Sequence, residues 1–152
     1  MRATIDSDLL VYVVDARDPI KHRVAGELLT TLATKDCWIG LQAIGEAYWA
    51  QLRRLRLPSQ DAAKLPRHAL SAFKTFGYSA MAVERALAEA VAGRFSYWDA
   101  LLLAAADEAG CRFCISEDMR DGATLGNVEI VHPFGPKGVS ERMQRTLAAL
   151  IA

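Results

Sequence analysis

The sequence lacks the long apolar runs that would mark a membrane protein. Its longest mainly apolar runs, 9–14 and 100–106, are far too short to cross a bilayer. An acid, Asp6, stands where a signal peptide would have its apolar region. We therefore expect a cytoplasmic protein without a membrane partner.

Cysteine is also scarce, with only Cys37, Cys111 and Cys114. An odd number of cysteines without a regular frame argues against a disulfide scaffold. Cys111 and Cys114 form a C-x-x-C, but no second such pair exists and the histidines are scattered, whereas structural zinc usually needs four ligands. A redox pair would typically begin a helix, and this one lies in an apolar, strand-like segment. We predict ordinary buried cysteines.

A net charge is missing as well, because 18 Lys and Arg residues balance 18 Asp and Glu residues. The chain as a whole therefore gives no electrostatic signal for nucleic acid, and an RNA partner would need local basic residues or bound metal. The candidate contacts for an RNA backbone, or for an acidic segment of a protein partner, are Arg53, Arg54 and Arg94. The alternative is that they belong to a solvated polar surface.

What the sequence does contain is a single-domain length, 152 residues, and enough hydrophobic residues, 52%, for a sizeable core. Strand-like segments fall at 3–5, 37–40, 112–115 and 128–131. Helical patterns fall at 9–15, 19–34, 41–55, 96–109 and 139–152, with a broken helical stretch at 59–92. This alternation predicts an α/β fold of three layers, α/β/α, around a short, mainly parallel sheet of four to five strands. We expect one domain over residues 1–134, with a helical extension, 135–152, packed on it.

Acidic residues follow two of the predicted strands. Open α/β sheets place their sites at the carboxyl ends of strands. The first strand ends directly in Asp6, and the third ends in Ser116-Glu117-Asp118. Asp99 lies in the first turn of an apolar and therefore buried helix, where the helix dipole favours an anion. Its alternative role is a capping box with Ser96, and both roles can hold together.

The sequence leaves undecided whether Glu46 lies on the surface or near the edge of the sheet. The larger apolar side chains of its helix share one face, and Glu46 points away from them, which indicates a surface glutamate. They are Leu41, Ile44, Tyr48, Leu52 and Leu55. In the alternative, the nearby face of small residues, Ala43, Ala47 and Ala50, packs closely against the sheet edge.

Carboxylates that crowd together repel one another unless a cation neutralises them. Hard oxygen ligands suit Mg²⁺, with Mn²⁺ as a substitute, and the set has none of the His and Cys that zinc prefers. We therefore predict a magnesium site that uses Asp6, Asp99 and Asp118 as direct or water-mediated ligands.

These acidic stretches resemble the PIN-domain family, and specifically the VapC-type toxins of toxin–antitoxin pairs. The matching stretches occur in the family's order over residues 4–134: TIDSDLLVY at 4–12, QAIGE at 42–46, SYWDALLLAAA at 96–106, ISEDM at 115–119 and VHPF at 131–134. Each stretch is weak alone, but their order and spacing together are specific.

The resemblance implies a PIN-like fold and a Mg²⁺-dependent endoribonuclease that hydrolyses RNA phosphodiester bonds with metal-activated water. It also implies the toxin role in a type II toxin–antitoxin system, with RNA as substrate, a cognate antitoxin as partner and a homodimer as assembly. The catalytic residues would be Asp6, Glu46, Asp99 and Asp118. Ser7 and Glu117 would have secondary roles.

Two features depart from the family's pattern. Asp8 stands where Asn is more usual, and we expect Asp8 to cap the following helix. The tail, 135–152, continues past the family's usual closing strand, and its apolar positions suggest a packing or pairing surface.

Three other functions stay open at this point. A catalytically silent PIN scaffold could bind RNA or a protein partner, and a nuclease of the same fold could act on DNA or on a particular nucleic-acid structure. A signalling receiver domain also groups acids around Mg²⁺, but it needs a phospho-accepting Asp after a middle strand. The strand at 37–40 ends in Ile39-Gly40 instead.

Overall fold

The computed structural model describes residues 1–152 and has a mainly parallel central sheet with helices on both faces. The four-stranded part has the order β1-β4-β6-β5, with β5 antiparallel. Its strands are β1 (Arg2–Ile5), β4 (Cys111–Ile115), β6 (Val128–Val131) and β5 (Thr124–Leu125). A parallel pair, β2 (Trp38–Gly40) and β3 (Lys74–Phe76), joins β1 through an isolated bridge between Ala3 and Cys37.

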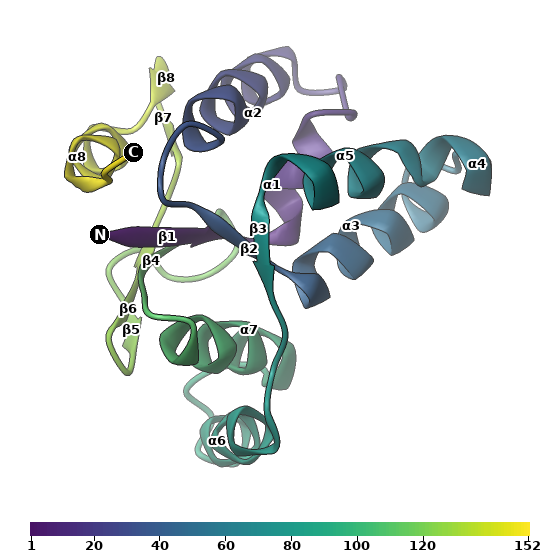
Figure 1. Cartoon of the computed structure of the whole chain (residues 1–152). Helices are drawn as coiled ribbons and strands as arrows, with labels where there is room; N and C mark the ends of the chain where they lie inside the picture. Colours follow the sequence, from purple (N-terminus) through teal and green to yellow (C-terminus); the bar gives the residue numbers. More distant parts are fainter.

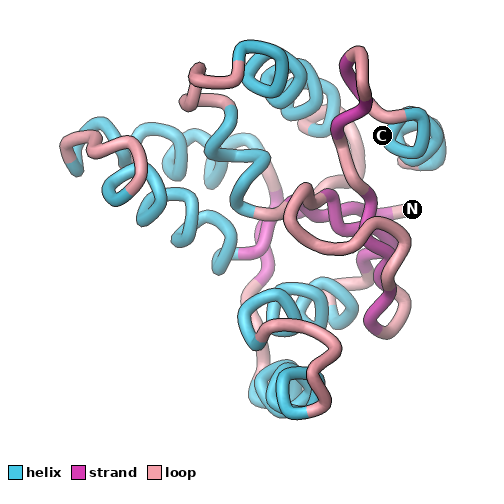
Figure 2. Tube along the Cα trace, turned by 180° about the vertical axis from the view of Figure 1, so that it is seen from behind, coloured by secondary structure: helices cyan, strands magenta, loops and turns pink.

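Two groups of helices enclose this sheet (Figures 1 and 2). On one side lie α1 (Ser7–Tyr12), α2 (Pro19–Leu32), α3 (Leu41–Arg53), α4 (Ser59–Ala62), α5 (Lys64–Ala72) and α8 (Glu141–Ala149). On the other lie α6 (Ala80–Val91) and α7 (Tyr97–Glu108). Each side has its own cluster of buried apolar residues against the sheet. The predicted three-layer α/β/α fold is therefore confirmed. No helix is both long and apolar enough to span a membrane.

Local signals in the sequence explain where the helices begin and end. Asp18 accepts a hydrogen bond from Lys21 N–H and Pro19 occupies the first turn of α2, where its missing N–H costs nothing. Gly110, at φ +78°, follows α7 in the left-handed conformation that ends many helices. Alanine and leucine fill 100–106, and every one of these side chains is buried.

Several short elements escaped the sequence prediction. The strands β3 and β5 are too short to show a period of two, and β3 lies within the stretch predicted as broken helix. The tail is not helical throughout, because a small hairpin of β7 (Phe134–Gly135) and β8 (Gly138–Val139) precedes α8. Met143 and Leu150 in this tail are buried in the core that α2 also covers.

The three cysteines are buried and form no disulfide, as predicted. Burial raises the pKa of Cys37 and of Cys111 to about 12. Such thiols stay protonated at neutral pH and are poor nucleophiles and metal ligands.

Candidate functional site

The pairing of β1 with β4 decides which residues meet at the carboxyl edge of the sheet. Ile5 lies opposite Ile115, and the Asp6 N–H donates to the Ile115 carbonyl at 2.9 Å. The residues that follow the two strands are therefore neighbours, and the Ser116 hydroxyl donates to Asp6 Oδ2 at 2.8 Å. Sequence reasoning missed Ser116, although its place directly after β4 matches the place of Asp6 after β1.

Asp6 also begins α1. Its Oδ1 accepts the Ser7 N–H at 2.7 Å, so Asp6 is the N-cap of the helix. The expectation that Asp8 caps this helix is wrong, because the helix starts directly after β1 and Asp8 already lies in its first turn. Asp8 is buried and pairs with Arg54, with 3.5 Å between Oδ1 and Nη1.

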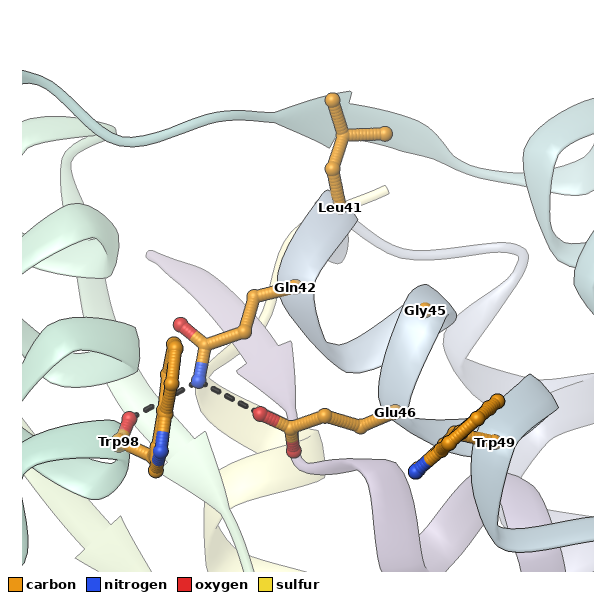
Figure 3. A pocket seen from close by; sticks show the side chains of 6 residues that line it. All are labelled: Leu41, Gln42, Gly45, Glu46, Trp49 and Trp98. Atoms are coloured by element: carbon orange, nitrogen blue, oxygen red, sulfur yellow. Dashed lines mark hydrogen bonds between the residues drawn. The ribbon is translucent and has the colours of Figure 1, made fainter.

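Glu46 reaches the same place from α3. Its Oε2 accepts a hydrogen bond from the Ser7 hydroxyl at 3.2 Å, and its Oε1 accepts one from Gln42 Nε2 at 2.7 Å. Gln42 Nε2 also donates to the Trp98 carbonyl at 2.9 Å, which links α3 to the start of α7 (Figure 3). Gln42 is a second contributor to the site that sequence reasoning missed.

The orientation of α3 corrects the surface reading of Glu46. The buried face of the helix contains Ala43, Ile44 and Ala47, whereas Leu41 is 49% exposed. Small side chains let the helix approach its neighbours closely, and this turns the adjoining Glu46 toward Ser7. The alternative that the sequence left open, a small-residue face packed inward, is the one that the structure has.

Asp99 is placed by the start of α7. Its N–H donates to the Ser96 hydroxyl at 3.2 Å, so the capping role holds, and its side chain is half-buried. The charge of Asp99 also affects the pKa of Asp6. The pKa of Asp6 is raised to about 6, mainly by burial. Hydrogen bonds from Ser116 and Ser7 lower it, and the charges of Glu46 and Asp99 raise it.

The other two predicted acids are not brought to this cluster. Asp118 is exposed, makes no hydrogen bond or ion pair, and is not among the charges that raise the pKa of Asp6. Glu117 turns toward α1 and α2, where it accepts a hydrogen bond from the Tyr12 hydroxyl at 2.6 Å and forms an ion pair with Lys21. The reason is that Ser116 takes the edge position after β4, and the chain then bends away.

Whether these residues suit Mg²⁺ depends on donor chemistry and spacing. No three Asp, Glu, His or Cys side chains converge closely enough to hold one ion between them. However, Asp6, Glu46 and Asp99 are oxygen donors whose mutual repulsion a cation would relieve. Mg²⁺ usually keeps several waters and uses one or two carboxylates, so these three residues fit an ion held largely through water.

The predicted basic contacts have different surroundings. Arg94 forms two hydrogen bonds with Glu89, at 2.7 and 3.0 Å, and Arg54 pairs with Asp8. Arg53 has no carboxylate partner and lies over the Trp49 ring, with its guanidinium carbon 4.9 Å from the ring centroid. Of the three, only Arg53 presents a cation that no acid neutralises.

Neither a model of a protein family nor a curated protein matches this sequence. Solved structures do match. VapC20 from Mycobacterium tuberculosis, a toxin that cleaves the sarcin–ricin loop, has a TM-score of 0.62 at 17% identity, over 74% of this chain and 86% of VapC20. A toxin–antitoxin complex from Klebsiella pneumoniae has a TM-score of 0.62 at 23% identity, over 87% of this chain and 98% of the other. VapBC2 from Rickettsia felis, bound to a promoter DNA fragment, has a TM-score of 0.62 at 12% identity, over 86% and 97%.

At such low identities, these likenesses establish the fold. The chain has the PIN-like fold of VapC-type toxins, with helices on both faces of a mainly parallel sheet. The resemblance that the acidic stretches indicated is thus confirmed at the level of the fold.

Proposed function

We propose that this protein is a Mg²⁺-dependent endoribonuclease and the toxin of a type II toxin–antitoxin pair. One observation carries the proposal: the end of β1, the helix α3 and the first turn of α7 bring Asp6, Glu46 and Asp99 together on a VapC-like fold. Mn²⁺ would substitute for Mg²⁺, because both are hard cations that bind oxygen.

Each residue has a role in this proposal. Asp6 and Asp99 would hold the ion, directly or through water, with Asp6 oriented by Ser116 and by the Ser7 N–H. Glu46, fixed by Ser7 and Gln42, would bind through water or orient the attacking water. When bound, Mg²⁺ supplies Lewis acidity and lowers the pKa of a coordinated water.

The direct test compares RNA cleavage with and without metal. We expect the purified protein to cut single-stranded RNA in MgCl₂, to stop in EDTA, and to resume when excess Mg²⁺ or Mn²⁺ is added. Cleavage products are read on denaturing gels with end-labelled RNA. Unchanged cleavage in EDTA would contradict the metal requirement, and cleavage of DNA alone would support the DNA-directed alternative.

The antitoxin partner is proposed from the solved complexes of this fold, in which toxin and antitoxin occur together. Induced expression in a bacterial host should arrest growth, and co-expression of a small protein from the neighbouring reading frame should relieve the arrest. A host that grows normally with soluble, RNA-cleaving protein would argue against the toxin role.

We also propose a homodimer, which light scattering on the purified protein tests directly.

The exposed position of Asp118 leads to a prediction that differs from what the family pattern implies. Asp118→Asn should lower the rate of RNA cleavage by less than about tenfold, because the side chain is exposed and apart from Asp6. Asp99→Asn should lower the rate far more. The check is initial cleavage rates of both variants at saturating Mg²⁺. Equal losses would mean that Asp118 joins the metal site when the ion binds.

One observation favours the silent scaffold as a second candidate. No three metal-binding side chains converge around a point, which is also what a PIN fold without catalysis would have. Such a protein would bind RNA or the antitoxin equally well with and without Mg²⁺, and would leave the RNA intact.

A further inference from the structure

A groove with a volume of about 540 Å³ opens next to Glu46, which is the one residue of the acid cluster that lines it. It lies between the first half of α3 and the first turn of α7 (Figure 3). Its lining residues are Leu41, Gln42, Gly45, Glu46, Trp49 and Trp98.

Two tryptophans form the walls of this groove. Trp49 is 54% exposed and Trp98 is 59% exposed, although tryptophan is usually far more buried. Figure 3 shows the two indoles on either side of the Glu46 carboxylate. Trp49 follows Glu46 by one turn of α3, and Trp98 directly precedes Asp99 in α7. Two flat aromatic surfaces, each more than half exposed, therefore border the acid cluster.

A cation lies at the Trp49 end of the groove. The Arg53 guanidinium is over the Trp49 ring and has no acid partner. An exposed aromatic ring beside an unpaired arginine suits a nucleotide, because the base stacks on the ring and the phosphate meets the guanidinium. An apolar peptide would cover the rings but would gain little from this cation.

Gln42, one of the residues that line the groove, also has a buried hydrogen-bond acceptor without a partner. Gln42 Nε2 donates to both Glu46 and the Trp98 carbonyl, and this orientation leaves Gln42 Oε1 without a partner although it is buried. A buried acceptor without a donor is costly. Gln42 therefore links Glu46 to the Trp98 carbonyl at the cost of one unsatisfied oxygen.

Gly45 forms part of the groove's floor and is unusual for its place. A glycine within a helix destabilises it relative to alanine. No atom lies within 4 Å of a Cβ built on Gly45, so close packing does not require the glycine. Its effect is to leave the space between Leu41 and Trp49 open.

We infer that this groove binds unstacked bases of single-stranded RNA, which stack on Trp49 and Trp98 while Arg53 contacts the backbone phosphate. The inference rests on the proposed ribonuclease function and names the part of the substrate that is recognised beside the acids. Stacking accepts every base, so the groove would favour unpaired RNA over a duplex rather than one sequence.

The test measures binding of a fluorescein-labelled, mixed-sequence 2′-O-methyl RNA heptamer by fluorescence polarisation in MgCl₂, with a gel to confirm that the probe stays intact. Trp49→Ala and Trp98→Ala should each raise Kd by about tenfold. Trp49→Phe and Trp98→Phe should stay within about threefold of wild type, because phenylalanine keeps a stacking face. Trp38→Phe is the matched control, since Trp38 lies between Arg2 and Lys74, away from the groove.

Gly45 supplies a variant that keeps both tryptophans. Gly45→Leu should raise the melting temperature, because leucine favours helix, and should raise Kd about tenfold by filling the groove. Gly45→Ala should raise the melting temperature too and leave Kd nearly unchanged, because one methyl group meets open space.

The outcomes separate this inference from the proposed function. If the wild-type protein never cleaves RNA but the tryptophan and Gly45→Leu variants bind the heptamer more weakly than wild type, the proposed ribonuclease function is contradicted. The groove inference is then still supported. If RNA is cleaved while Trp49→Ala, Trp98→Ala and Gly45→Leu all bind the heptamer as wild type does, the groove inference is overturned. The same holds if these variants lose only the binding of a protein partner.

Discussion

Asp6→Asn is expected to reduce Mg²⁺-dependent RNA cleavage on the order of 10²–10³-fold while the protein stays folded. Asp6 is the buried centre of the acid cluster, and its two oxygens are held by Ser116 and Ser7. An amide keeps the size of the side chain but removes the charge that would attract the ion. Initial rates over a range of MgCl₂ concentrations should show both a weaker metal dependence and a lower maximum.

Asp8→Asn is the matched control for this loss. It removes a carboxylate only two residues away, in the same helix, and its ionic partner Arg54 is largely exposed at 62%. We expect it to keep cleavage within about threefold of wild type, because Asp8 pairs with Arg54 and is not among the charges that act on Asp6. Wild-type rates in Asp6→Asn, or equal losses in both variants, would remove Asp6 from the proposed role.

The second prediction concerns stability: without metal, Asp6→Asn should be more stable than wild type at pH 7.5, by on the order of 2 kcal/mol. Burial first, and then the nearby acids, raise the folded-state pKa of Asp6 from 3.8 to about 6. Between these two values the folded state holds a proton that the unfolded state has lost. Wild-type stability therefore falls as the pH rises from about 4 to about 6, and this loss persists above pH 6.

Urea unfolding at pH 4.5 and at pH 7.5, in EDTA, measures this difference. The gain in stability of Asp6→Asn over wild type should be small at pH 4.5, where Asp6 is mostly protonated in the folded wild-type protein. Saturating Mg²⁺ should then stabilise wild type and not the variant, because a ligand that binds only the folded state stabilises it. A difference between the two proteins that does not change with pH would contradict the raised pKa. Removing a functional acid would thus trade activity for stability.

Parts of this site could be predicted from residues near one another in the chain. Asp6 directly follows a short strand, and Asp99 lies in the first turn of a helix whose following residues are apolar on every side. Strand ends and helix starts are local features, so a single sequence shows them. The rule that sites lie at the carboxyl ends of parallel strands then brings Asp6 to the correct edge.

Other parts depend on pairing between distant segments. The parallel register that sets Ile5 opposite Ile115 makes Ser116, rather than Asp118, the neighbour of Asp6. A shift of one residue would turn every side chain of β4 to the other face, and no local pattern specifies that alignment. The strand-end rule and the resemblance to the family both indicated Asp118, but the structure leaves it exposed.

By itself, therefore, the sequence determined the layered fold, the edge of the sheet that carries the acids, and the inert character of the cysteines. Only the tertiary structure decided that Glu46 faces Ser7, that Glu117 pairs with Lys21, and that two exposed tryptophans border the acid cluster. Periodicity tells which face of a helix is apolar, but the face that packs inward depends on the shape of its neighbours. In α3 the small residues pack inward, because alanine lets the helix come close enough for its glutamate to reach the strand end.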